Sequence, residues 1–276
     1  MSSSPNSPSS SGPESREKAP GGGAALGQPL ITYRGVYKSF GNKDVLLGID
    51  LDVYEGETLV IVGRSGSGKT VMTSMLVGLV EPDRGEITVG GVDIRQLKTD
   101  ADWRELRLKT GYLFQGSALY DSMTVGENVA FPMEQHKDWS PGEISRRVHE
   151  KLAQVGLEEA EGQEPASLSG GMMRRAALAR SLALDPQLII YDEPTAGLDP
   201  ITCDEIGHLI RRMQRTLKVT SIVVSHDMRL VELVADRVTL IHSGRMAFLG
   251  TYEEFRESSQ AEVRRFLHVG QEEKQE

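Results

Sequence analysis

Residues Gly63–Thr70 read Gly-Arg-Ser-Gly-Ser-Gly-Lys-Thr and fit the pattern G-x-x-x-x-G-K-[ST] at every fixed position. The apolar run Glu57–Val62 before it has the length of a buried strand, and Val71–Leu79 after it is apolar at helical spacing. A strand, a glycine loop and a helix in this order are the context that makes the pattern a phosphate-binding site. An ordinary glycine-rich turn is the alternative, and it requires neither flank.

Each part of this loop has a predicted task. Its glycines let the backbone curl so that several N–H groups point inward at an anion, and the helix start adds a partial positive charge. Lys69 is predicted to reach the β- and γ-phosphates of ATP, and the Thr70 hydroxyl is predicted to hold Mg²⁺. The predicted nucleotide-contacting residues of the loop are Gly63, Arg64, Ser65, Gly66, Ser67, Gly68, Lys69 and Thr70.

Composition narrows the class of protein. The chain of 276 residues carries 40 Asp and Glu against 31 Lys and Arg, and this acidic balance argues against nucleic-acid binding, which relies on basic side chains. A single cysteine, Cys203, excludes an internal disulfide and is typical of a reducing compartment. No apolar run reaches the roughly 18 residues of a membrane span, and no signal pattern opens the chain. We therefore expect a cytoplasmic protein whose link to a membrane runs through a partner.

The order of patterns predicts an α/β fold with a mostly parallel, doubly covered sheet, interrupted by a helical insert over about 116–186. Residues 1–28 are rich in Ser, Pro and Gly and predict a disordered tail. The main domain is expected over 29–258, and a short helix with a charged tail over 259–276. In the insert, Ser140–Glu143 forms a capping box that opens one helix, and a second helix begins near Leu168.

A second chemical signal is Asp192-Glu193, which directly follows the buried strand Leu188–Tyr191. A carboxylate at the carboxyl end of such a strand faces the crevice where parallel sheets bind ligands. Asp192 is predicted to hold Mg²⁺, and Glu193 to act as general base on the attacking water, a role that contributes about 10²- to 10⁴-fold in rate. Gln115 and His226 also end strands, and we expect Gln115 to touch metal and water, and His226 to contact the γ-phosphate.

Ser169, Gly170 and Gly171 open the second helix of the insert and form another potential anion nest. The chain already has one nest for a triphosphate. The three residues are therefore either a plain helix cap or a nest for the γ-phosphate bound by another copy of the chain.

Together these motifs resemble, in order and spacing, an ABC transporter ATPase subunit over about residues 30–258. The resemblance implies a P-loop NTPase (RecA-like) core, an antiparallel β subdomain and the inserted helical subdomain. It implies that Phe40 stacks on adenine and that Asp199 belongs to the nucleotide site. It also implies a head-to-tail homodimer with ATP between one phosphate loop and the partner's Ser169–Gly171, and an integral membrane permease docked on the insert after Gln115.

A narrower resemblance is to the ATPases of Mce-type phospholipid transporters, the maintenance-of-lipid-asymmetry (Mla) group. The segment Leu113–His136 carries it, together with Met172 where the family usually has Gln, the arginine-rich run Arg174–Arg180, and the segments Asp199–Thr202 and Val263–Leu267. It implies phospholipid as cargo, a lipid-binding Mce-type subunit in the same system, and a peripheral position on the cytoplasmic face of the inner membrane.

Two other interpretations share the catalytic motifs. One is the ATPase of an importer for polar amino acids or other small solutes. The other is an ABC ATPase that acts on no membrane. Against the second stands an apolar cluster that we expect to be exposed for docking, with plain core as the alternative. Its members are Ala118, Leu119, Tyr120, Met123, Phe131 and Met133.

Overall fold

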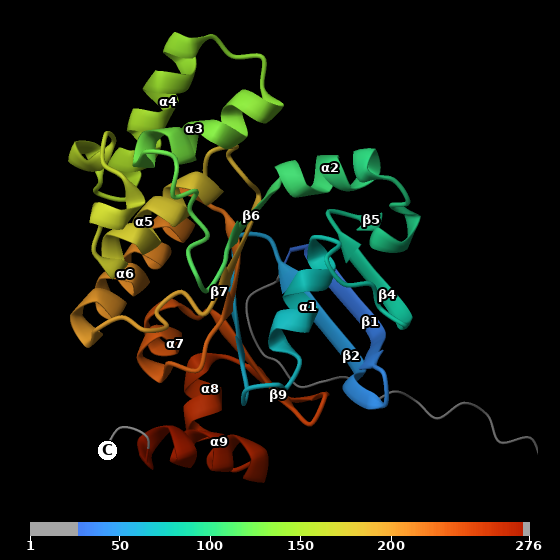
Figure 1. Ribbon diagram of the computed structural model, residues 1–276. Helices are drawn as coiled ribbons and strands as arrows, with labels where there is room; N and C mark the ends of the chain where they lie inside the picture. The colour runs from blue at the N-terminus through green and yellow to red at the C-terminus, as the bar shows by residue number, and fades with distance from the viewer. Residues whose placement is uncertain (1–26, 273–276) are drawn as a thin grey trace, which may run out of the picture.

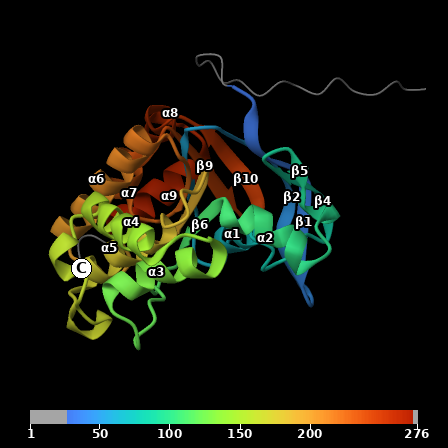
Figure 2. The same ribbon diagram turned by 90° about the horizontal axis from the view of Figure 1, so that it is seen from above.

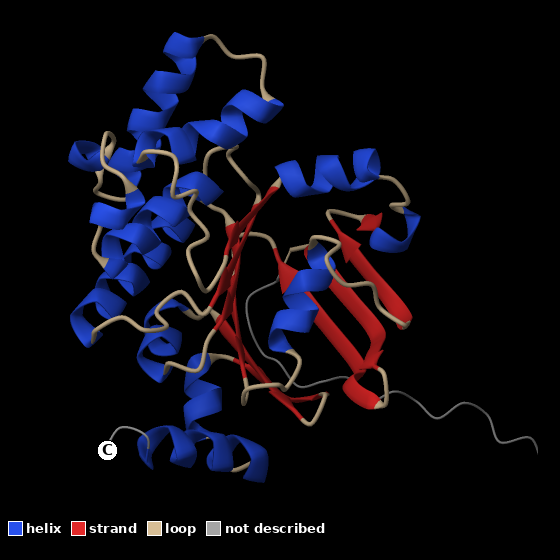
Figure 3. Cartoon of the chain, in the orientation of Figure 1, coloured by secondary structure: helices blue, strands red, loops and turns tan. Residues whose placement is uncertain are grey.

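The computed structural model describes residues 27–272, which form two β-sheets and the helices that cover them (Figures 1 and 3). The smaller sheet is antiparallel, with the order β2-β1-β4-β5. Its strands are β1 (Pro29–Phe40), β2 (Lys43–Tyr54), β4 (Arg84–Val89) and β5 (Val92–Asp93). The larger sheet has the order β10-β9-β3-β8-β7-β6, and only the β10–β9 pair is antiparallel. Its strands are β3 (Thr58–Val62), β6 (Thr110–Leu113), β7 (Leu188–Asp192), β8 (Thr220–Val224), β9 (Arg237–His242) and β10 (Arg245–Gly250).

The larger sheet separates two hydrophobic cores, because side chains on a strand alternate between its faces. On β3, Leu59 and Ile61 enter one core, and Val60 and Val62 enter the other. All five residues of β3 are buried, as are those of β7 and β8. This burial on both faces explains the continuous apolar runs from which the parallel sheet was predicted.

One face of the larger sheet packs against α1 (Lys69–Leu76), α2 (Asp100–Leu108) and the antiparallel sheet. The other face is covered by α3 (Val125–His136), α4 (Pro141–Gln154), α5 (Gly170–Ser181), α6 (Pro200–Leu217), α7 (Met228–Val234), α8 (Tyr252–Glu257) and α9 (Ala261–Glu272), which supply the second core. Seen from above, the two sets of elements lie on opposite sides of the larger sheet (Figure 2). The predicted fold class is confirmed.

The helical subdomain, α3 to α5, lies between β6 and β7 in the chain; α5 packs against β6, and α3 and α4 pack against α5 (Figure 1). Each of its helices starts at a hydroxyl side chain that accepts a bond from the backbone two or three residues into the helix. The three caps are Thr124, Ser140 and Ser169. None of the helices between residues 27 and 272 combines the length and apolar character needed to cross a membrane.

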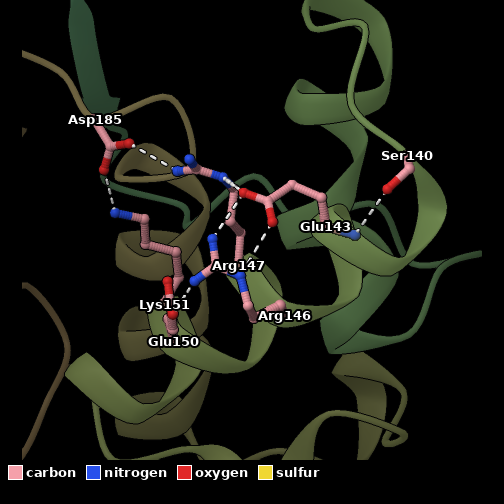
Figure 4. Close-up of polar contacts among 7 residues, drawn as sticks. All are labelled: Ser140, Glu143, Arg146, Arg147, Glu150, Lys151 and Asp185. Atoms are coloured by element: carbon pink, nitrogen blue, oxygen red, sulfur yellow. Dashed lines mark hydrogen bonds and ion pairs between the residues drawn. The ribbon is translucent and has the colours of Figure 1, made fainter.

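Ion pairs attach α4 to the turn between α5 and β7 (Figure 4). Asp185 occupies the left-handed region, with φ 53°, and accepts bonds from Arg147 and from Lys151, whose side chain is 6% exposed. Arg147 also pairs with Glu143 at 2.7 Å and lies over the ring of Trp139, with 4.0 Å from the guanidinium carbon to the centroid. These ion pairs therefore hold α4 against the turn that precedes β7, the strand that ends in Asp192.

The structure also differs from the sequence-based expectations. Helix α3 was not predicted as a separate element, although Thr124 and Glu127 form a capping box at its start. Met133 was expected in an exposed docking cluster but is 0% exposed and belongs to the core, whereas Tyr120 is 46% exposed. The expected disordered tail falls outside the described residues except for residues 27 and 28.

Candidate functional site

The loop Gly63–Thr70 joins β3 to α1 and has a backbone that demands glycine at several positions. Gly66 and Gly68 have φ values of 75° and 105°, a region that side chains rarely adopt. At Gly63, an added Cβ would lie 2.5 Å from the carbonyl oxygen of Ile241. The predicted strand–loop–helix context is therefore present. The buried hydroxyl of Ser67 has no hydrogen-bond partner in the structure, which fits a loop built to receive an anion.

Lys69 lies at the first position of α1 and is 8% exposed. Its Nζ donates to the carbonyl oxygens of Gly63, at 2.8 Å, and Arg64, at 3.2 Å, so the side chain folds back over the loop. Burial lowers the pKa of the ammonium group, while the nearby carboxylates of Glu193 and Asp192 act in the opposite direction. The loop thus holds a desolvated cation, which a phosphate oxygen would stabilise.

Thr70 and Asp192 place two oxygen ligands side by side, because the Thr70 hydroxyl donates to Asp192 Oδ1 at 3.4 Å. Asp192 ends β7 and is buried, and this burial, reinforced by the charge of Glu193, raises the pKa of its carboxyl group. A divalent cation bound here would relieve both effects. Oxygen donors, with one or two carboxylates and substrate phosphates, are the ligands that Mg²⁺ takes, so these residues fit the predicted metal.

Glu193 and His226 form a pair at the ends of β7 and β8. His226 Nδ1 lies 3.0 Å from Oε1 and 2.9 Å from Oε2 of Glu193. The hydrogen bond with Glu193 raises the pKa of His226 against the opposing effect of burial. Glu193 has φ 50°, and its backbone N–H donates to the carbonyl oxygen of Val224 at 2.9 Å. Because Glu193 has this left-handed backbone, the chain turns directly after Asp192, and the carboxylates of Asp192 and Glu193 point in different directions.

The strand order explains why these groups meet. Strands β3, β8, β7 and β6 are neighbours and run parallel, so their carboxyl ends share one edge of the sheet. The residues that follow those ends are the phosphate loop, His226, Asp192-Glu193 and Gln115. Gln115 is exposed, two residues beyond the last residue of β6. The structure therefore brings together the residues that were predicted from separate strand ends.

Three other groups that were predicted to contact nucleotide lie apart from this edge. Phe40 is at the hairpin between β1 and β2 and is 49% exposed, and the Lys38 Nζ lies 5.2 Å from the centroid of its ring. Ser169–Gly171 opens α5 on the opposite face of the sheet from α1, and the Ser169 hydroxyl accepts from the backbone N–H of Met172 at 3.2 Å. The Asp199 carboxylate caps α6 and accepts the Thr202 hydroxyl at 2.6 Å.

One site residue was missed by the sequence reasoning. The helical pattern placed Arg174 on a polar face of α5, but the side chain is 5% exposed. Its guanidinium group donates to backbone carbonyl oxygens of the loops that follow β6 and β7. A single helix's periodicity contains no signal for this, because the carbonyl partners come from other parts of the chain.

Comparison with known proteins agrees with this geometry. The family model described as ABC transporter matches residues 46–196, which span the phosphate loop, the nest and Asp192-Glu193. The chain belongs to the ABC transporter family. It is accordingly an ATPase, which binds and hydrolyses ATP.

Relatives in the ABC transporter family span most of the chain. It is 39% identical to the intermembrane phospholipid transport system ATP-binding protein MlaF of Haemophilus influenzae over 242 residues, 88% of this chain and 91% of MlaF. It is 38% identical to TRIGALACTOSYLDIACYLGLYCEROL 3 of Arabidopsis thaliana, over 86% of this chain and 73% of that protein. It is also 37% identical to the methionine import ATP-binding protein MetN of Leifsonia xyli, over 86% of this chain and 70% of MetN.

Solved ABC cassettes share the fold. A dimeric, post-hydrolysis state of the cassette MJ0796 bound to ADP and Pi superposes with a TM-score of 0.73 at 30% identity, covering 80% of this chain and 98% of that one. The inserted helical subdomain and the antiparallel sheet are thus features of an ABC ATPase, as the sequence motifs predicted.

Proposed function

We propose that this chain is the ATPase subunit of a transporter that moves phospholipid between membranes. The observation that carries the cargo assignment is the identity to MlaF along nearly the full length of both chains. That alignment is accompanied by the Mla-like segment Leu113–His136, which includes the exposed Tyr120. MetN is nearly as similar, so the ATPase site does not discriminate between cargoes.

The residues at the carboxyl edge of the larger sheet have the chemical groups that ATP hydrolysis requires. We assign Glu193 as the general base that takes a proton from the attacking water, with His226 orienting its carboxylate through the 2.9–3.0 Å contact. His226 also contacts the γ-phosphate, and Lys69 neutralises charge on the β- and γ-phosphates. Gln115 positions the water and completes the metal site. Mg²⁺ held by Thr70 and Asp192 would supply charge neutralisation on the phosphates.

A homodimer completes the nucleotide site in this proposal. Helix α5, which the nest Ser169–Gly171 opens, and helix α1, which follows the phosphate loop, pack on opposite faces of the larger sheet, so we infer that the two elements of one chain do not serve one nucleotide. An exposed nest at a helix start is an anion site that a second copy can use. The dimeric arrangement of MJ0796 with ADP and Pi supports this inference.

Membrane attachment is proposed to run through a permease that docks on the helical subdomain after Gln115. Tyr120 packs edge to face on Phe131 at 5.1 Å and is half exposed, so part of its ring is available for docking. The proposed location is the cytoplasmic face of the inner membrane, with a lipid-binding Mce-type subunit in the same system. ATP closes the dimer, and closure moves the docked permease.

Purification of the tagged full-length chain from detergent-solubilised membranes of its native cells tests the proposal. We expect co-purification of a permease and of a lipid-binding subunit, with ATPase activity of the complex stimulated by phospholipid. If methionine or another small solute, delivered by a solute-binding protein, stimulates the ATPase activity instead, the cargo is a small solute and not phospholipid. Recovery of active ATPase without any membrane protein would favour an ABC ATPase that acts on no membrane.

A further inference from the structure

Arg174 is a buried cation without a carboxylate partner among the hydrogen bonds and ion pairs of residues 27–272. Its Nη1 donates to the carbonyl oxygens of Phe114, at 3.0 Å, and Gln115, and its Nη2 donates to the carbonyl oxygen of Ala196 at 3.3 Å. Its buried Nε has no partner in the structure. Burial lowers the pKa of the guanidinium group. A charge buried in this way is costly unless its bonds compensate, so the three carbonyl contacts are the reason that the side chain remains inside.

The first two carbonyls belong to the loop that follows β6 and carries Gln115. After β6 the chain passes through two successive left-handed residues, Ser117 and Ala118, with φ 61° and 53°. Non-glycine residues rarely adopt this region, and such strain persists only where the surroundings fix it. Arg180, also on α5, donates to the carbonyl oxygens of Ala118 at 2.7 Å and Ser117 at 3.2 Å. Two arginines of one helix therefore hold the loop that carries Gln115.

The third carbonyl belongs to the loop that follows the general base. The backbone N–H of Ala196 donates to the carbonyl oxygen of Glu193 at 3.2 Å, so Ala196 lies in the same turn as Glu193. Arg174 thus touches both loops that the proposed chemistry uses, and it extends from the helix whose first residues are the nest for the partner's nucleotide.

We propose that Arg174 is a positioning residue that holds Gln115 and the turn after Glu193 in register with the nest at the start of α5. The inference rests on the proposed role of Gln115 in hydrolysis and is independent of phospholipid as cargo. The role assigned to Arg174 is exerted through these two loops and not on the reacting atoms.

The test uses the full-length chain and three variants, Arg174→Gln, Arg174→Lys and the control Arg175→Gln. Arg175 is a matched control because it lies on the same helix and donates to a carbonyl, that of Gly156 at 3.4 Å, away from both loops. A displacement of about 1 Å at a reacting group can cost about 10²-fold in rate, so Arg174→Gln is expected to lower kcat by roughly 10- to 100-fold. The Kd for ATP is expected to stay within about twofold, since the phosphate loop is intact.

Arg174→Lys is expected to fall between Arg174→Gln and the wild type, because one ammonium group reaches fewer carbonyls than the guanidinium fork. This variant keeps the buried charge and serves the test if Arg174→Gln does not fold. Arg175→Gln is expected to leave kcat within about twofold of the wild type. Equal losses in Arg174→Gln and Arg175→Gln would overturn the proposal.

A double-mutant cycle with Gln115→Ala separates positioning from a purely structural role. This change removes the Gln115 side chain and leaves the carbonyl that Arg174 contacts. If Arg174 acts through Gln115, Arg174→Gln or Arg174→Lys lowers kcat much less in the Gln115→Ala background than in the wild type. Fully additive losses would refute the positioning role. If Gln115→Ala alone leaves kcat unchanged, the proposed role of Gln115 fails first.

Discussion

Replacing Glu193 by Gln removes the proposed general base with almost no change in shape. The side chain is 14% exposed and lies beside His226, so the amide of Gln occupies the same space and keeps a polar partner for the ring. Loss of a general base costs about 10²- to 10⁴-fold in rate. This corresponds to a barrier increase of about 2.7 to 5.5 kcal/mol.

Binding of ATP is expected to survive the same change. The phosphate loop contributes its backbone groups and Lys69, whose hydrogen bonds go to the carbonyl oxygens of Gly63 and Arg64 and not to Glu193. Removing one negative charge next to the triphosphate site also lessens electrostatic repulsion of the nucleotide. ATP should therefore bind with equal or higher affinity and accumulate unhydrolysed in a closed dimer.

The assay combines phosphate release, ATP titration by fluorescence and size-exclusion chromatography with ATP. Glu193→Gln should show kcat reduced by at least about 10²-fold, unimpaired ATP binding and a dimer peak that the wild type loses as it hydrolyses ATP. Glu253→Gln, at an exposed position of α8, is the matched control. Hydrolysis by Glu193→Gln at a rate near that of the wild type would refute its assignment as the base.

Three other changes test neighbouring parts of the structure. Lys69→Ala should lose measurable ATP binding, and retained affinity in a fluorescence titration would count against the phosphate-loop assignment. His226→Ala should bind ATP but turn over slowly, and unchanged kcat would make the residue structural. The raised pKa of His226 means that its pairing stabilises the fold below the unfolded value of about 6.5 and that this stabilisation is lost as pH rises through the folded value. In an NMR titration the pKa of His226 should fall in Glu193→Gln, and an unchanged pKa would show that the pair does not form. Asp185→Asn keeps a residue that tolerates φ 53° but removes the charge facing Lys151, and it should destabilise the fold by about 1–2 kcal/mol in urea. An equal loss in 1 M salt would show that charge pairing is not the cause.

The sequence predicts the parts of this molecule whose causes are local. The phosphate loop is determined by a strand, glycines and a helix that follow each other directly, and the inner strands are recognisable because burial on both faces makes them continuously apolar. Convergence of Gln115, Asp192 and His226 was predictable from the rule that parallel strands share a carboxyl edge. The neighbour relation β8-β7-β6, which makes the convergence close, is set by pairing across long stretches of chain.

Features with distant causes were not predictable in the same way. Helix α3 contains Pro132 and a buried Asn128, which obscure its apolar pattern, so only its capping box marks it. Asn128 is buried because its side chain satisfies backbone groups of Tyr120, Met123 and Thr124. In the same way Arg174 is buried through carbonyls from two other loops. In both cases the hydrogen-bond partner, rather than the residue type, decides burial.

The ionisation of Asp192 and Lys69 at the sheet edge depends on neighbouring charges, so a charged ligand bound there changes its free energy. Burial and the charge of Glu193 both disfavour ionised Asp192, while burial disfavours charged Lys69. A triphosphate bound together with a divalent cation supplies the missing partner for each group, because phosphate oxygens face Lys69 and the metal faces Asp192. Binding of both ligands would therefore offset part of the electrostatic cost of burying Asp192 and Lys69, so ligand binding stabilises the fold.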